Sequence, residues 1–132
     1  MIKNWFYLIV GILSVLFAFT HTWNGLQTSL SVLNNVEMDG GTKTTFTYVW
    51  HIIGIENLVF GIALLIMAFQ KNLEKVKFTA WVIIAILIMR LIIISIFSFI
   101  NNTSIIEILI DSIAILVAIA LLYFGTRIKN IT

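Results

Sequence analysis

The sequence predicts an all-α integral membrane protein, a single domain of residues 1–132 folded as an antiparallel four-helix bundle. Of the 132 residues, 61% are hydrophobic and only 11% are charged. Soluble domains carry about 45–50% apolar and about 25% charged residues. The mean hydropathy is +1.09, and four stretches reach the roughly 20 apolar residues that a spanning helix needs. One soluble core of this size could not hide so much apolar surface, so lipid is the expected solvent.

Four transmembrane helices are predicted, at residues 4–23, 49–69, 78–100 and 105–125. The first follows Lys3 as the apolar part of a signal peptide would, but it lacks a small-x-small cleavage site and is therefore interpreted as a retained helix. The chain contains no proline, so none of the four helices needs a proline kink.

The connections between the helices differ in length and charge. Residues 70–77 (QKNLEKVK) are short and basic, and residues 101–104 (NNTS) form a tight turn. Residues 24–48 are the one long loop. Three leucines in its first half are spaced at i, i+4 and i+7, which indicates an amphipathic helix that either continues the first span or lies on the membrane surface. The DGG sequence at 39–41 is expected to end that helix.

The basic residues predict the orientation. Lys43 falls on one side of the membrane, and six basic residues fall on the other: Lys3, Lys71, Lys75, Lys77, Arg127 and Lys129. Because cytoplasmic loops are enriched in Lys and Arg, both termini should lie in the cytoplasm and the 24–48 loop outside the cytoplasmic (plasma) membrane. Topology and anionic lipid headgroups explain the basic loop better than nucleic acid does.

Four charged residues fall inside the predicted spans: Glu56, Arg90, Glu107 and Asp111. An Arg or Asp at a helix centre costs about 2.5–3.5 kcal/mol on insertion scales, and intramembrane ionisable residues usually serve a function. With a rise of about 1.5 Å per residue, Glu56 lies about 10 Å and Arg90 about 15 Å below the outer end of its helix. All four therefore belong to the outer half or the midplane of the membrane.

Two histidines are expected near the same end. His21 is close to the outer end of the first span and His51 to the outer start of the second. Small residues along a stripe mark close approach between membrane helices, so the stripes that contain ionisable residues should face inward. On the fourth span this stripe is Ser104, Glu107, Asp111, Ala114 and Ala118, and on the first it is Gly11, Ser14, Ala18 and His21.

The second span has two faces that compete for neighbours. Trp50, Gly54, Asn57 and Gly61 form one stripe, and Glu56 lies about 100° away from Asn57 around the helix. One of these faces is therefore predicted to meet another subunit. The sequence thus predicts a homo-oligomer.

The predicted function is binding or transport of a cation or a small amphipathic molecule in an outward-facing intramembrane pocket. Three acids against one arginine leave an excess of two negative charges if all are ionised, which a protonated group or a bound cation would relieve. The expected ligand-binding residues are His21, His51, Glu56, Asn57, Arg90, Glu107 and Asp111. Membrane lipid is a further expected partner.

Two alternatives stay open. One is a membrane enzyme that performs acid–base chemistry, as an isomerase does, on a lipid-like substrate through Asp111 and His21. The other is a subunit of a membrane complex, or a metal- or haem-binding protein in which His21 and His51 ligate. The chain has no cysteine and no HExxH, G-x-S-x-G or P-loop motif. No ligand pair has a tight metal-binding spacing, and Trp50 would crowd a haem. The sequence predicts no metal site and identifies neither a cofactor nor a reaction.

Overall fold

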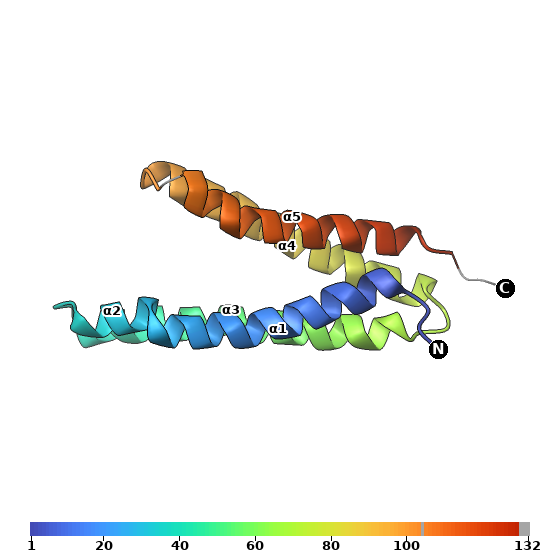
Figure 1. The fold of residues 1–132 in the computed structure, drawn as a ribbon, viewed down its shortest axis with the longest axis horizontal. Coiled ribbons are helices and arrows are strands. Elements are labelled where there is room, and N and C mark those ends of the chain that lie inside the picture. The colour runs from blue at the N-terminus through green and yellow to red at the C-terminus, as the bar shows by residue number, and fades with distance from the viewer. Residues whose placement is uncertain (104, 130–132) are drawn as a thin grey trace. The chain divides into compact units, whose positions relative to one another are not determined.

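The computed structural model describes residues 1–103 and 105–129, except for the side chains of residues 105, 107, 108, 110 and 111. Throughout this described part the regular structure is helical and no strand occurs, which confirms the all-α class. The elements are α1 (Trp5–Gln27), α2 (Ser29–Asn35), α3 (Gly40–Ala68), α4 (Glu74–Ile100) and α5 (Ile105–Arg127), shown in Figure 1.

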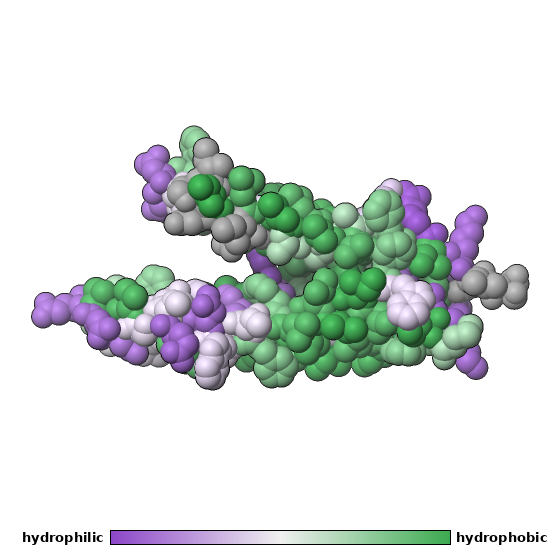
Figure 2. Space-filling view, in the orientation of Figure 1, coloured by the Kyte–Doolittle hydropathy of each residue, from purple (hydrophilic) through white to green (hydrophobic). Residues whose placement is uncertain are grey.

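Three helical stretches are long and apolar enough to cross a membrane. They are Trp5–Asn35 with 31 residues, Gly40–Ala68 with 29 and Glu74–Ile100 with 27. Hydrophobic residues cover most of α1 and α3, and hydrophilic ones gather around α2 (Figure 2). Exposing this much apolar surface to water would cost about 25 cal/mol per Å². The length and composition of these helices thus indicate a membrane protein. The part of α5 in which every side chain is described, Ser112–Arg127, is also apolar but shorter, so the fourth span, the sidedness and the identity of the membrane stay predictions.

The predicted outer loop at 24–48 is mostly helical. The first helix runs on to Gln27, α2 continues it, and only residues 36–39 separate α2 from α3. Hydrogen bonds from the Thr28 N–H to the Asn24 carbonyl (2.9 Å) and from the Val32 N–H to the Thr28 carbonyl (3.0 Å) carry the helical pattern through the irregularity at Thr28. The leucine spacing thus belongs to a continuation of the first span.

The expected break at 39–41 is instead the start of α3. Asp39 is the N-cap: its Oδ1 accepts the Thr42 N–H at 2.9 Å, and its Oδ2 accepts the Thr42 hydroxyl. These bonds satisfy donors that a helix start leaves open, so the two following glycines become the first helical turn. The same hydrogen bonds from Thr42 hold the pKa of the exposed Asp39 carboxyl below its ordinary value.

The chain divides into two compact units, described separately here: the α1–α3 unit (residues 11–65) and the terminal unit (residues 1–10 and 66–132). In the α1–α3 unit, the two helices approach closely through glycines. A Cβ at Gly61 would lie 2.6 Å from Val15 Cγ2 and 2.9 Å from the Gly11 carbonyl oxygen, and one at Gly11 would lie 3.0 Å from the Leu65 nitrogen. Gly11, Ala18 and Gly25 recur at seven-residue intervals, as do Gly54 and Gly61, which keeps this seam continuous.

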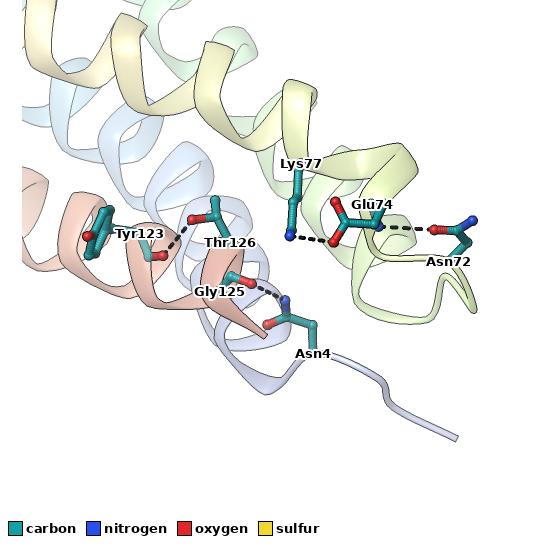
Figure 3. Close-up of polar contacts among 7 residues, drawn as sticks. All are labelled: Asn4, Asn72, Glu74, Lys77, Tyr123, Gly125 and Thr126. Atoms are coloured by element: carbon teal, nitrogen blue, oxygen red, sulfur yellow. Dashed lines mark hydrogen bonds and ion pairs between the residues drawn. The ribbon is translucent and has the colours of Figure 1, made fainter. Parts of the chain in front are cut away.

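The terminal unit is fastened at one end by Asn4, which is 0% exposed. Its Oδ1 accepts the Tyr7 N–H at 3.2 Å as an N-cap of α1, and its Nδ2 donates to the Gly125 carbonyl at 2.9 Å (Figure 3). The N–H groups of Lys3 and Asn4 both donate to the Ala68 carbonyl, at 2.8 and 3.1 Å. The N-terminus, the end of α3 and the end of α5 therefore meet at one place.

The rest of the terminal unit is the pair α4 and α5, which lie side by side (Figure 1). Four residues of α4 form its buried face: Ala80, Ile83, Ile84 and Leu87. On α5, Leu122 is fully buried, and Gly125 leaves room for the Tyr7 ring, whose Cε1 would lie 2.5 Å from a Cβ there.

Candidate functional site

The seven predicted ligand-binding residues are distributed over both units. Four belong to the α1–α3 unit, namely His21, His51, Glu56 and Asn57, and Arg90 belongs to the terminal unit. The side chains of Glu107 and Asp111 lie outside the described residues. Their meeting with Arg90 in one pocket therefore stays a prediction.

His21 lies between two aromatic rings. Its imidazole stacks on Trp50 with 4.5 Å between ring centroids and an interplanar angle of 5°, and on Phe17 at 5.3 Å and 21°. The Trp50 indole N–H donates to the His21 carbonyl at 3.1 Å. Two aromatic rings, one from α1 and one from α3, thus pack against the imidazole.

Trp50 reaches this position because Gly25 has no side chain. A Cβ at Gly25 would lie 1.9 Å from the indole Nε1. Trp50 therefore packs inside the α1–α3 unit. The apolar run predicted a second span that begins at residue 49 and so placed Trp50 at its end. In the structure α3 begins ten residues before Trp50, which therefore lies within the helix.

His51 lines an open groove of about 530 Å³ between α2 and the first half of α3. Its walls are formed by Asn34, Lys43, Thr44, Thr47, Tyr48, His51, Ile52 and Ile55. Lys43 donates from Nζ to the Asn34 carbonyl at 3.3 Å, which ties α3 to α2 at the polar end of the groove. Ile52 and Ile55 lie at the opposite, apolar end. The lining contains a lysine, a histidine and three hydroxyl groups, and no carboxylate.

A second groove of about 300 Å³ runs beside the glycine seam. Its lining is apolar except for the Thr22 hydroxyl, and Ile55 borders both grooves. The seam lies at its floor, since a Cβ at Gly54 would come within 2.7 Å of Thr22 Oγ1. We refer to the first groove as the His51 groove and to this one as the seam groove.

The two faces of α3 that competed for neighbours are now distinguished. The glycine stripe packs against α1 of the same chain, and Asn57 on that stripe is 7% exposed and donates to the Ile53 carbonyl at 2.7 Å. Glu56, two residues after Gly54, lies about 200° around the helix from the α1-facing side. With the glycine face packed against α1, the Glu56 face is the one left to meet another subunit, and the homo-oligomer stays a prediction.

Arg90 continues the buried stripe of α4. It follows Leu87 by three residues and Ile83 by seven, so the three share one face, and Arg90 itself is half-buried. An arginine here costs less than one facing acyl chains would, because it lies on the side of α4 that packs inside the protein.

Within the terminal unit, Ala114 on the predicted inward stripe of α5 is exposed and Ala118 is half-buried, so this stripe does not pack against α4, and its facing the α1–α3 unit stays a prediction. The residues that are buried instead include Ser112, which is 9% exposed, and Thr126, which is 4% exposed. Together with the half-buried Ile119 they follow a seven-residue spacing, one residue away from the predicted stripe. The predicted stripe was the one with the most small and acidic residues, but the side of α5 that packs also carries the large aliphatic residue Ile119.

Sequence reasoning missed the polar cluster of the terminal unit. Besides Asn4, this cluster contains Thr126, whose hydroxyl donates to the Tyr123 carbonyl at 2.7 Å (Figure 3). The Tyr7 ring is 1% exposed. The available signal was Asn4 itself, since an asparagine directly before an apolar run is a typical helix N-cap.

Within the part of the chain whose side chains are described, no group of three or more His, Asp or Glu residues could hold a metal ion. Comparison with known proteins gave no matching family model, no similar curated protein and no similar solved structure. The chemistry of the grooves is therefore the basis for a functional proposal.

Proposed function

We propose that this membrane protein binds a small amphipathic molecule with an anionic head in the His51 groove. The observation that carries the proposal is the order of side chains along the groove: the Lys43 ammonium and three hydroxyls at one end, His51 in between, and Ile52 and Ile55 at the other. Its volume of about 530 Å³ falls within the roughly 300–1,000 Å³ of typical ligand sites.

The charges of the groove favour an anionic head over a cation. A cation would meet the Lys43 ammonium and find no carboxylate among the lining residues. A carboxylate or phosphate head would accept hydrogen bonds from Lys43 and His51, and such charge-assisted bonds are stronger than neutral ones. The apolar tail would lie on the two isoleucines, where it replaces lipid contacts.

Binding is supported better than transport. Transport would need a polar passage toward the other end of α1, and there the side chains of Asn4, Tyr7 and Leu122 are almost fully buried. The buried amide of Asn4 is engaged by Tyr7 and Gly125 and does not line a passage. We therefore propose a binding protein whose ligand enters from the α2 end of the α1–α3 unit.

The proposal is tested with paired probes on the protein in nanodiscs of uncharged lipid. The probes are a dansyl-labelled fatty acid and a dansyl-labelled alkylammonium of equal chain length, and energy transfer from tryptophan reports binding. The fatty acid should bind more tightly. Its affinity should fall about tenfold or more in Lys43→Gln, because a hydrogen bond to a charged group contributes about 1.5–3 kcal/mol.

Glu56→Gln is the matched control, because it removes a charge from α3 outside the groove lining. Fatty-acid affinity should stay within twofold of the parent in this variant. Tighter binding of the alkylammonium, lost in Glu56→Gln and kept in Lys43→Gln, would show that the ligand is a cation and would overturn the proposal.

A further inference from the structure

One end of the terminal unit, which we call the basic end, gathers most of the positive charge of the chain. Of the eight Lys and Arg residues, six belong to it: Lys3, Lys71, Lys75, Lys77, Arg127 and Lys129. Between residues 66 and 103 the only acidic residue is Glu74, and its Oε1 lies 2.5 Å from Lys77 Nζ (Figure 3). After Glu74 is paired with Lys77, the basic end keeps an excess of positive charge from its other five basic side chains.

These charges come from three chain segments that are fastened together. Lys3 and Asn4 bond to the Ala68 carbonyl at the end of α3, and the Asn4 side chain bonds to Gly125 near the end of α5. The three segments are therefore held within hydrogen-bonding distance of one another. Their basic residues form one surface and not three separate patches.

Aromatic residues border this surface on its apolar side. Trp5 is 60% and Trp81 46% exposed, and Trp81 meets Tyr123 edge-on with 6.0 Å between ring centroids. The Arg127 guanidinium lies 4.9 Å from the centroid of the Tyr123 ring, and its Nη2 donates to the Tyr123 hydroxyl. Along this end of the protein, the apolar helices are followed by the exposed indoles and then by the basic side chains. This is the order in which acyl chains, the interface and the headgroups follow one another across a leaflet.

We propose that the basic end binds the headgroups of anionic phospholipids and so holds a shell of phosphatidylglycerol-type lipids around the terminal unit. Phosphates of such lipids carry a net negative charge that zwitterionic headgroups balance internally. The interaction of one lysine with a nearby anionic membrane surface corresponds to about a fivefold preference for an anionic over a zwitterionic lipid. Exposed indoles next to the charges fit a lipid surface better than a nucleic acid, which has no apolar layer beside its phosphates.

Quenching of tryptophan by brominated lipids tests this directly, because the four tryptophans divide between the two units. A Trp23→Phe/Trp50→Phe variant keeps Trp5 and Trp81 as reporters at the basic end. A Trp5→Phe/Trp81→Phe variant keeps Trp23 and Trp50 in the α1–α3 unit as the matched control. Each is reconstituted in mixtures of phosphatidylcholine and phosphatidylglycerol in which one lipid or the other is brominated, and the ratio of the two quenching efficiencies gives the lipid preference.

The expected result is a several-fold preference for phosphatidylglycerol at Trp5 and Trp81, larger than the preference at Trp23 and Trp50, because Lys43 is the one basic residue in the sequence of the α1–α3 unit. Added to the basic-end reporter, Lys71→Gln/Lys75→Gln/Lys129→Gln should bring the preference close to one. Raising the salt concentration should weaken it. Equal quenching by both lipids at the basic end, or a preference that survives the triple substitution, would overturn the proposal.

Discussion

The seam between α1 and α3 predicts a large effect for a small substitution, Gly61→Val. A Cβ at this position would lie 2.6 Å from Val15 Cγ2 and 2.9 Å from both the Val15 nitrogen and the Gly11 carbonyl oxygen. Two of these atoms are backbone, so no rotamer change relieves the clash, and α1 must move by about 0.5 Å to restore ordinary contact. Overpacking costs about 1–3 kcal/mol, and valine's two further carbons place this site at the upper end of that range.

Gly40→Val is the matched control, because it makes the same chemical change in the same helix where a Cβ would meet nothing within 4 Å. Both variants are unfolded reversibly by SDS in mixed micelles, with circular dichroism as the readout. We expect Gly61→Val to lose about 2–3 kcal/mol relative to Gly40→Val. Equal stability of the two variants would refute the close approach of the two helices.

Three more predictions follow from particular contacts. Asn4→Ala removes the α1 N-cap and leaves the buried Gly125 carbonyl without its donor, so the free energy of unfolding should fall by about 1–3 kcal/mol. The control is Asn35→Ala at an exposed position, and an equal loss in both variants would contradict the role of Asn4. Gly25→Ala should expel Trp50 from its stack on His21, seen as a shift of the emission in a variant that keeps Trp50 as its one tryptophan; an unchanged spectrum would argue against that packing. The pKa of Asp39 is lowered, so its cap should be fully present above the ordinary Asp pKa of about 3.9 and be lost as the pH falls through the lower value of the folded state. Amide exchange at the start of α3, compared with Asp39→Asn, measures this, and a profile that is the same in both would exclude the cap.

The sequence predicted the helical class and the membrane because both follow from composition and from the length of apolar runs. It misplaced the boundaries in 24–48 because hydropathy marks where lipid begins, and helices continue past that point when capping allows. Asp39 and Thr42 satisfy the first turn of α3, and the hydroxyls of Thr44 and Thr47 bond back to carbonyls four residues earlier. Polar residues are thus compatible with a helix that extends beyond the apolar layer.

The candidate site was predictable only in part. The glycine stripe of α3 correctly indicated a close helix contact, but spacing alone could not identify α1 of the same chain as the neighbour. His51 was singled out for its position near a helix end, and the structure places it in a groove. Lys43 and Tyr48 were not proposed as ligand residues, because their roles depend on α2 folding back beside α3. The aromatic stack that covers His21 likewise depends on Gly25 lying opposite Trp50.

Photo-crosslinking with a diazirine fatty acid tests the ligand proposal most directly. The protein in nanodiscs is irradiated with the probe, digested, and the labelled peptides are identified by mass spectrometry. Label should concentrate on residues 34–55, be displaced by unlabelled fatty acid and decrease strongly in Lys43→Gln. Label spread evenly over the exposed faces of α4 and α5, and unaffected by competitor, would contradict a ligand in the His51 groove.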